Sequence, residues 1–131
     1  AQTYGRNQLD SIDALQENWK RSLLWALPDI EDGLVHDILL CSREAVLNSL
    51  RHGCGEGETM TLLFRWRPSG VLEVQVDDPG EGHEYDWSDS LADRGDGMQE
   101  FSRGLLLIHT LPSAVRTRRR GAHLTLEFSL R

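Results

Sequence analysis

The sequence predicts an α+β domain in which helices pack on one face of a mixed β-sheet. Apolar residues recur at helical spacing through roughly the first fifty positions, which indicates two amphipathic helices. Two pairs of segments with alternating apolar and polar residues follow, at residues 59–77 and 114–130, and each pair contains a turn. Because the predicted strands are grouped with helices and do not alternate strictly with them, an α+β layer with helices on one face of the sheet is favoured.

Size and composition limit the classes of protein to consider. The 131 residues fit one domain, 1–131, that can bury a core. The hydrophobic content of 39% and charged content of 27% are typical of soluble globular proteins. Neither a membrane-spanning stretch nor a secretion signal is evident, so we expect a cytoplasmic protein. The net charge of −7 argues against nucleic-acid binding. A first residue other than methionine suggests a domain from a larger regulatory protein.

The first half of the chain is predicted to be helical. Helical periodicity over residues 8–27 ends at Pro28, and a second helix covers about 31–52. Apolar residues surround much of the second helix, so it should be largely buried, and Gly53 is placed to cap its C-terminus. Cys41 and Cys54 lie too far apart on this helix to form a disulfide, so both should be buried thiols.

The second half is predicted to form two hairpins separated by a loop and a helix. Strands at Thr59–Arg67 and Val71–Asp77 flank a turn at Pro68-Ser69-Gly70. The irregular stretch from about 83 to 100, here called the lid, is predicted to be a loop that is either functional or disordered, and Ser102 can cap a helix that runs to about Leu111. Strands at 114–118 and 123–130 then enclose a turn at 119–121. No strand is evident before Asp10.

Two segments carry side chains suited to nucleotide chemistry. Glu44, Asn48 and His52 are four residues apart, so they rise along one face of the second helix. A carboxylate beside an amide oxygen suits Mg2+, which prefers oxygen ligands. Asp78 follows a predicted strand, and Gly80 and Gly82 after it allow the backbone to approach a flat ligand closely.

This ordered set resembles the nucleotide-binding boxes of a known superfamily. Glu44/Asn48/His52-Gly53, then D-x-G-x-G at 78–82, then Ser102-Arg103-Gly104-Leu105 resemble the boxes of the ATPases that include gyrase, the heat-shock chaperones, histidine kinases and MutL, known as GHKL. The resemblance covers roughly residues 30–130, and the form E-x-x-x-N-x-x-x-H-G most resembles the anti-sigma-factor serine kinases of bacteria. It implies a two-layer α/β sandwich, the Bergerat-type ATP-binding fold, with ATP and Mg2+ as cofactors.

The resemblance implies a role for each matched residue. Glu44 would act as the catalytic base toward the accepting hydroxyl, and Asn48 would be a ligand of Mg2+. Asp78 would accept a hydrogen bond from the adenine amino group. The alternatives are a solvated helix glutamate at position 44 and an ordinary turn aspartate at position 78, with Asp77 as a neighbouring candidate for the adenine contact.

Other matched residues have both a binding and a structural interpretation. His52 would lie beside the nucleotide or cap the helix end. Arg103, Gly104 and Leu105 would open a helix whose free N–H groups receive the phosphates, although an ordinary helix start fits equally. The basic cluster is a solvated hairpin or a docking patch for an acidic partner; it contains Arg116, Arg118, Arg119 and Arg120.

The leading hypothesis is an ATP- and Mg2+-dependent protein serine/threonine kinase. It would phosphorylate an anti-sigma factor antagonist and sequester that protein or a sigma factor. One alternative is the catalytic domain of a histidine kinase. The other is a non-catalytic partner-switching module with a degenerate nucleotide site, because Ser102, Glu100, 111–113 and 121–123 depart from the family pattern. Whether the protein forms a homodimer stays open.

Overall fold

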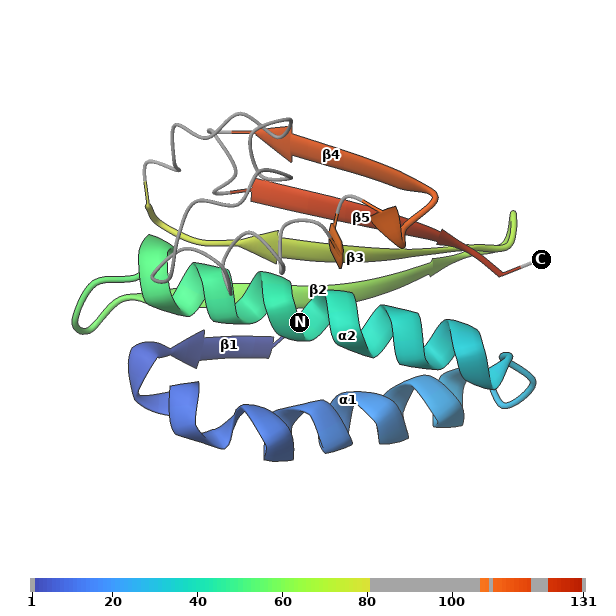
Figure 1. Cartoon of the computed structure of the whole chain (residues 1–131), viewed down its shortest axis with the longest axis horizontal. Helices are drawn as coiled ribbons and strands as arrows, with labels where there is room; N and C mark the ends of the chain where they lie inside the picture. The colour runs from blue at the N-terminus through green and yellow to red at the C-terminus, as the bar shows by residue number, and fades with distance from the viewer. Residues whose placement is uncertain (1, 81–106, 109, 119–122, 131) are drawn as a thin grey trace.

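The computed structural model describes residues 2–80, 107–108, 110–118 and 123–130, and Figure 1 draws the remaining residues as a grey trace. The helical elements are α1 (Ile12–Ala26), α2 (Asp32–Asn48), a 3-10 helix η1 (Arg6–Ser11) and a π-helix η2 (Ser49–Gly53). The strands are β1 (Gln2–Gly5), β2 (Thr59–Arg67), β3 (Val71–Asp77), β4 (Ala114–Arg118) and β5 (His123–Ser129). None of these helices is long and apolar enough to span a bilayer.

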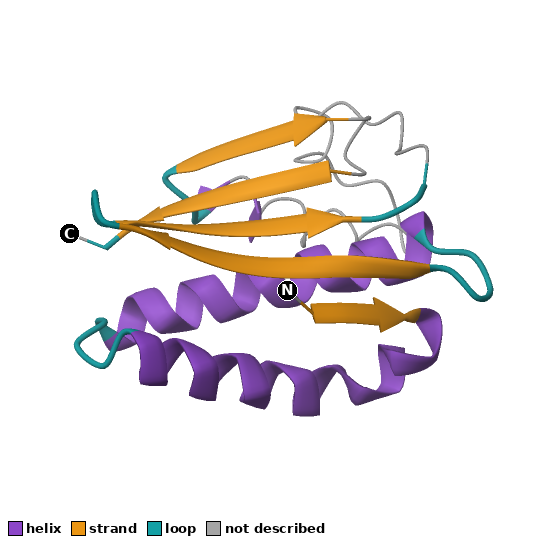
Figure 2. Cartoon of the chain, turned by 180° about the vertical axis from the view of Figure 1, so that it is seen from behind, coloured by secondary structure: helices purple, strands orange, loops and turns teal. Residues whose placement is uncertain are grey.

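The described elements form two layers. The sheet has five strands in the order β1-β2-β3-β5-β4. In Figure 1 α2 runs in front of the sheet with α1 beside it, and from behind the strands lie in front of α2 (Figure 2). Both helices therefore belong to one side of the sheet, which confirms the predicted α+β sandwich.

The sheet is antiparallel at each described strand pair, not mixed as predicted. The two hairpins can form only antiparallel pairs. β4 runs in the same direction as β3, and a parallel pair would arise if the two were neighbours. Instead β5 lies between them, so each strand meets a neighbour of opposite direction.

Side chains alternate between the two faces of each strand, and the apolar side chains on the inner face fill the space between the sheet and the helices. Leu72, Val74 and Val76 of β3 are almost fully buried, and so are the matching residues of β5. Trp19 of α1 is completely buried, with ring centroids 6.5 Å from Phe64 of β2. The largest fully buried apolar side chains include Trp19, Phe128, Ile38, Leu50, Met60, Leu62, Leu72, Ile108 and Leu126.

The opening strand β1 was not predicted. It is short and pairs with the first half of β2, from Gln2 opposite Leu62 to Gly5 opposite Thr59. Tyr4 is its one buried side chain, and its hydroxyl oxygen accepts a hydrogen bond from Trp19 Nε1 at 2.9 Å. The segment 8–27, which was predicted to be one helix, begins in the 3-10 helix η1 and becomes α-helical at Ile12.

Both hairpins have the predicted strands. The bounds of β2 and β3 match the prediction, and Gly70 has the positive φ of 92° that the turn requires.

Cys41 and Cys54 are buried free thiols, as expected. Of the predicted helix after the lid, only its end is described, where Leu111 N donates to Leu107 O at 3.0 Å. The lid at 83–100 and the turn at 119–121 lie outside the described residues.

Candidate functional site

Glu44 and Asn48 project from one face of α2, as the four-residue spacing predicted. Both side chains are partly buried, so they are shielded but reachable. Beyond Asn48 the helix changes to the π-helix η2, in which a turn needs more residues than in an α-helix. His52 therefore does not continue the line of the first two side chains by an α-helical turn, and it is exposed.

Gly53 ends the π-helix by a mechanism different from the one predicted. The positive-φ glycines among the described residues are Gly57 and Gly70, so Gly53 is not a left-handed helix cap. Its Cα lies directly against the carboxyl group of Asp78, and a Cβ at position 53 would collide with all three atoms of that group. A glycine is needed here for close packing.

Asp78 is held at this contact by its own loop. The residue is 6% exposed, and its Oδ1 accepts a hydrogen bond from the backbone N of Gly80 at 3.0 Å. Gly80 also packs against the helix end, because a Cβ there would lie 2.9 Å from Gly53 O. Gly53, Asp78 and Gly80 thus join the end of the helix that carries Glu44 and Asn48 to the segment after β3.

The two adjacent aspartates face different surroundings. Asp77 is the last residue of β3, its side chain is half exposed, and its Oδ1 lies 3.5 Å from His123 Nδ1. Asp78 is buried at the helix end. Asp78 is thus the carboxylate that lies against Gly53, at the end of the helix that carries Glu44 and Asn48.

Two thiols lie close to the candidate carboxylates. Burial, together with the negative charge of Asp78 and then Glu58, raises the pKa of Cys54 to about 11, against a smaller opposing effect of Arg6. Burial, followed by the charges of Asp37 and Glu44, raises the pKa of Cys41 to about 12. Both cysteines are therefore neutral at physiological pH and unsuited to nucleophilic chemistry.

Cys41 also connects the helix layer to the residues before β4. Its Sγ lies 3.6 Å from Leu107 O, and the neighbouring Ile108 is 1% exposed. The chain segment that leads into β4 is thereby packed against the middle of α2, one turn from Glu44. Gly82, Arg103, Gly104 and Leu105, which were predicted to bind nucleotide, lie outside the described residues.

The described residues contain no cluster of three or more histidine, cysteine or carboxylate side chains that could hold a metal ion alone. A lone amide oxygen such as that of Asn48 instead suits an ion that keeps waters and phosphate oxygens as further ligands. Gly53 and Gly80 pack against each other and against the Asp78 carboxyl group, so they fix a buried carboxylate at the end of the helix.

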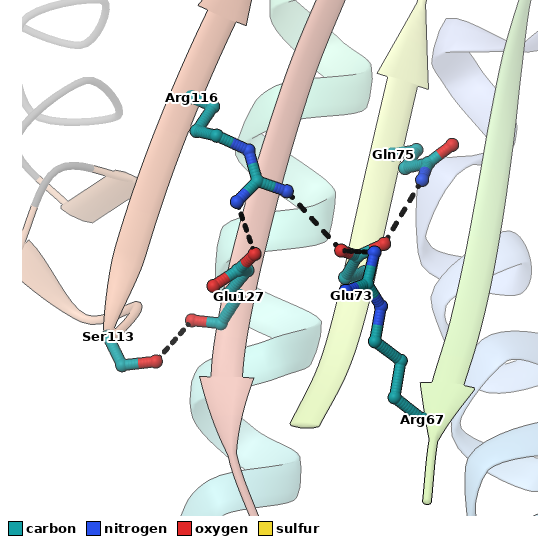
Figure 3. Close-up of polar contacts among 6 residues, drawn as sticks. All are labelled: Arg67, Glu73, Gln75, Ser113, Arg116 and Glu127. Atoms are coloured by element: carbon teal, nitrogen blue, oxygen red, sulfur yellow. Dashed lines mark hydrogen bonds and ion pairs between the residues drawn. The ribbon is translucent and has the colours of Figure 1, made fainter. Parts of the chain in front are cut away.

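The sequence did not reveal a charged network on the opposite face of the sheet (Figure 3). Glu73 is completely buried there, 2.7 Å from Arg67 Nη2 and 3.3 Å from Arg116 Nη2. Arg116 also pairs with Glu127, which lies directly opposite Glu73 in the sheet, so the guanidinium neutralises two facing carboxylates. The hydrogen bond to Glu127 and the negative charge of Glu127 raise the pKa of Arg116 above its ordinary value. Arg116 is therefore exposed but ion-paired to the sheet, so it is not a free charge of a basic patch.

Taken together, a two-layer α+β sandwich, a central helix with Glu44 and Asn48, and a buried aspartate at its end define an ATPase-type domain of the GHKL class. The comparison with protein families agrees. The profile described as "Histidine kinase-like ATPase domain" matches residues 7–130, nearly the whole chain, and the chain belongs to this family. Domains of this family bind ATP, typically with Mg2+. No curated protein showed significant similarity to the chain.

Proposed function

We propose that the chain is an ATP- and Mg2+-dependent protein serine/threonine kinase of the anti-sigma-factor type. The observation that carries this proposal is the packing of Asp78 against Gly53, at the end of the helix that bears Glu44 and Asn48. This contact supports the proposal because it joins two parts of the sequence motif, the helix end and the segment after β3, that a whole hairpin separates. The motif form itself, Glu-x-x-x-Asn-x-x-x-His-Gly, favours serine kinases within the family.

In this proposal Asp78 selects the base. Its carboxylate accepts a hydrogen bond from the adenine 6-amino group, where guanine has a carbonyl oxygen instead. Burial makes that selection stronger, because an unmatched polar group in a dry site loses its hydrogen bond without replacement by water. Gly80, and Gly82 after it, let the base lie against the backbone.

Asn48 and Glu44 serve the phosphate end. The amide oxygen of Asn48 is a ligand of Mg2+, which spreads the charge of the phosphates. Glu44 lies one helical turn away and accepts the proton of the attacking hydroxyl. The motif assigns the phosphates to Arg103, Gly104 and Leu105, which lie outside the described residues. His52, which is exposed, lies at the rim of the site.

The partner in this proposal is a small cytoplasmic anti-sigma factor antagonist with an exposed serine or threonine. Phosphorylation of that protein, and sequestration of it or of a sigma factor, would be the regulatory output. A phosphoryl-transfer assay tests the reaction: the purified chain is incubated with labelled ATP, Mg2+ and an anti-sigma factor antagonist. Label on serine or threonine survives acid treatment, whereas label on histidine is lost, so the product distinguishes this proposal from a histidine-kinase domain.

Variants make the assay specific. Glu44→Gln is expected to lower the rate of transfer by about 100- to 10,000-fold, the usual contribution of a general base, while ATP affinity changes little. Glu17→Gln, an exposed change of the same kind on α1, should leave transfer unchanged. Equal transfer by the Glu44→Gln and unmodified proteins would refute the base role. Partner binding without any transfer would instead assign the chain to the non-catalytic partner-switching modules.

A further inference from the structure

The π-helix η2 decides which residue lies one turn beyond Asn48 at the end of α2. An α-helix turns through about 100° per residue, whereas a π-helix, with about 4.4 residues per turn, turns through roughly 82°. The five residues Ser49–Gly53 therefore turn through about the same angle as four α-helical residues. Gly53, not His52, takes the next place on this face after Asn48. The exposure agrees, because Gly53 is buried and His52 is exposed.

Asp78 fills the space that a side chain at position 53 would occupy. A Cβ on Gly53 would overlap all three atoms of the Asp78 carboxyl group, and Asp78 is only 6% exposed. The carboxyl group therefore lies directly against the backbone of the residue that follows Asn48 on this face of the helix. Any side chain at position 53 would have to displace this carboxyl group.

Gly80 also holds the Asp78 carboxyl group. Its backbone N donates to Asp78 Oδ1 at 3.0 Å, and a Cβ on Gly80 would lie 2.9 Å from Gly53 O and 3.0 Å from the same Oδ1. The backbone of Gly53 and the N–H group of Gly80 together fix the orientation of the carboxylate. Because hydrogen bonds weaken steeply as they bend, a ligand that donates to this carboxylate depends on that orientation.

We propose that Gly53 is a positioning residue for base selection and that it acts through Asp78. The inference rests on the proposed function, in which the Asp78 carboxylate accepts a hydrogen bond from the adenine amino group. Gly53 contributes by having no side chain, because its bare backbone sets the angle at which the carboxylate meets the base. Discrimination between ATP and GTP is then a property of residue 53 as well as of residue 78.

The ratio of the ATP and GTP affinities separates this role from a purely structural one. A change that only destabilised the domain would reduce the folded fraction, so the apparent affinities for ATP and GTP would fall by the same factor. A displaced carboxylate instead loses a hydrogen bond that only adenine donates, so the affinity for ATP falls and the affinity for GTP does not. Gly53→Ala is therefore expected to lower the ATP/GTP affinity ratio by about 10-fold or more.

Titration calorimetry with Mg2+ and either ATP or GTP measures the ratio, on protein that circular dichroism shows to be folded. Tyr4→Phe is the matched control, because it removes the buried hydrogen bond from Trp19 and so lowers stability. Its ATP/GTP ratio should equal that of the unmodified protein. Gly80→Ala is the second test if Gly53→Ala does not fold. Its Cβ would press on Asp78 Oδ1, so its ratio should fall in the same direction.

A double variant tests whether Gly53 acts through Asp78. In Asp78→Asn the contact with the base is already lost, so adding Gly53→Ala should change the ATP/GTP ratio by less than about twofold. A further fall in the double variant, or an unchanged ratio in folded Gly53→Ala or Gly80→Ala, would overturn the inference while the proposed function stands. A failure of the proposed function appears in the unmodified protein instead, which would then bind neither nucleotide or bind both equally, and it overturns this inference as well.

Discussion

Replacing Gly53 with alanine tests the contact on which the candidate site depends. A glycine outside the left-handed region ordinarily gains stability on replacement by alanine, about 0.4 to 1 kcal/mol, because the unfolded chain loses freedom. At position 53 the new methyl group would instead overlap the Cγ and both carboxyl oxygens of Asp78. The sign of the effect therefore depends on whether this close approach exists.

The size of the loss follows from what must move. Overpacking of a well-packed site costs about 1 to 3 kcal/mol. If the Asp78 carboxylate rotates away, its hydrogen bond from Gly80 N, 3.0 Å long, is also lost, which adds about 1.5 to 3 kcal/mol when the acceptor is charged. After the gain expected of alanine is subtracted, we predict that Gly53→Ala lowers the free energy of unfolding by about 1.5 to 5.5 kcal/mol.

Urea unfolding followed by circular dichroism measures this difference, with Gly33→Ala as the control. Gly33 lies in the exposed first turn of α2, and a Cβ there would meet nothing closer than Glu31 Oε1 at 3.9 Å. That variant should gain about 0.4 to 1 kcal/mol. If Gly53→Ala were as stable as Gly33→Ala, Gly53 and Asp78 would not be in close contact, and the candidate site that depends on this contact would be refuted.

Three further predictions concern the core, the outer face and alkaline pH. Tyr4→Phe leaves the buried Trp19 N–H without its 2.9 Å acceptor and should cost about 1 to 3 kcal/mol in urea unfolding; no loss would argue against the docking of β1 on α1. Glu73→Ala leaves Arg67 and Arg116 without their shared partner and should cost about 1 to 3 kcal/mol, because both arginines can regain water, whereas Glu127→Ala should cost less than about 1 kcal/mol. Equal losses would contradict the central place of Glu73. The raised pKa values of Cys41 and Cys54, about 12 and 11 against an ordinary 9.0, mean that the stability they contribute is complete below pH 9 and is lost as the pH rises toward those values. Cys41→Ala/Cys54→Ala should therefore show a shallower fall in unfolding free energy between pH 9 and 11 than the unmodified protein, and parallel curves would refute this.

Local patterns predicted most of the fold. The hairpin of β2 and β3 could be placed to the residue because alternation, a Pro-Ser-Gly turn and strand-forming side chains agree there. β1 could not, because Gln2–Gly5 is short and polar, and it becomes a strand only by pairing with β2 and burying Tyr4 against Trp19. The antiparallel sheet was missed for a similar reason, since the order of strands is a tertiary property.

The candidate site was predictable in part. The α-helical spacing placed Glu44 and Asn48 on one face correctly, but no sequence pattern predicted the π-helix that turns His52 away from that line. Gly53 was predicted to be a helix cap, whereas it is needed for close packing against Asp78. A contact with a residue far away in the sequence leaves no local pattern from which it could be predicted. Glu73 has the pattern of an ordinary solvent-facing strand residue, and its ion pairs come from Arg67 on the next strand and from Arg116 on a strand two places away in the sheet.

In the proposed function Asp78, and not its neighbour Asp77, selects the base at the end of the helix that carries Asn48. Titration calorimetry with ATP and GTP in the presence of Mg2+, on the unmodified protein, Asp78→Asn and Asp77→Asn, tests it directly. We predict a preference for ATP that Asp78→Asn abolishes with a loss of about 10- to 100-fold in affinity, the value of one buried hydrogen bond to a charged group, while Asp77→Asn binds as the unmodified protein does. Equal affinity for ATP and GTP in the unmodified protein, or a larger loss in Asp77→Asn than in Asp78→Asn, would contradict it.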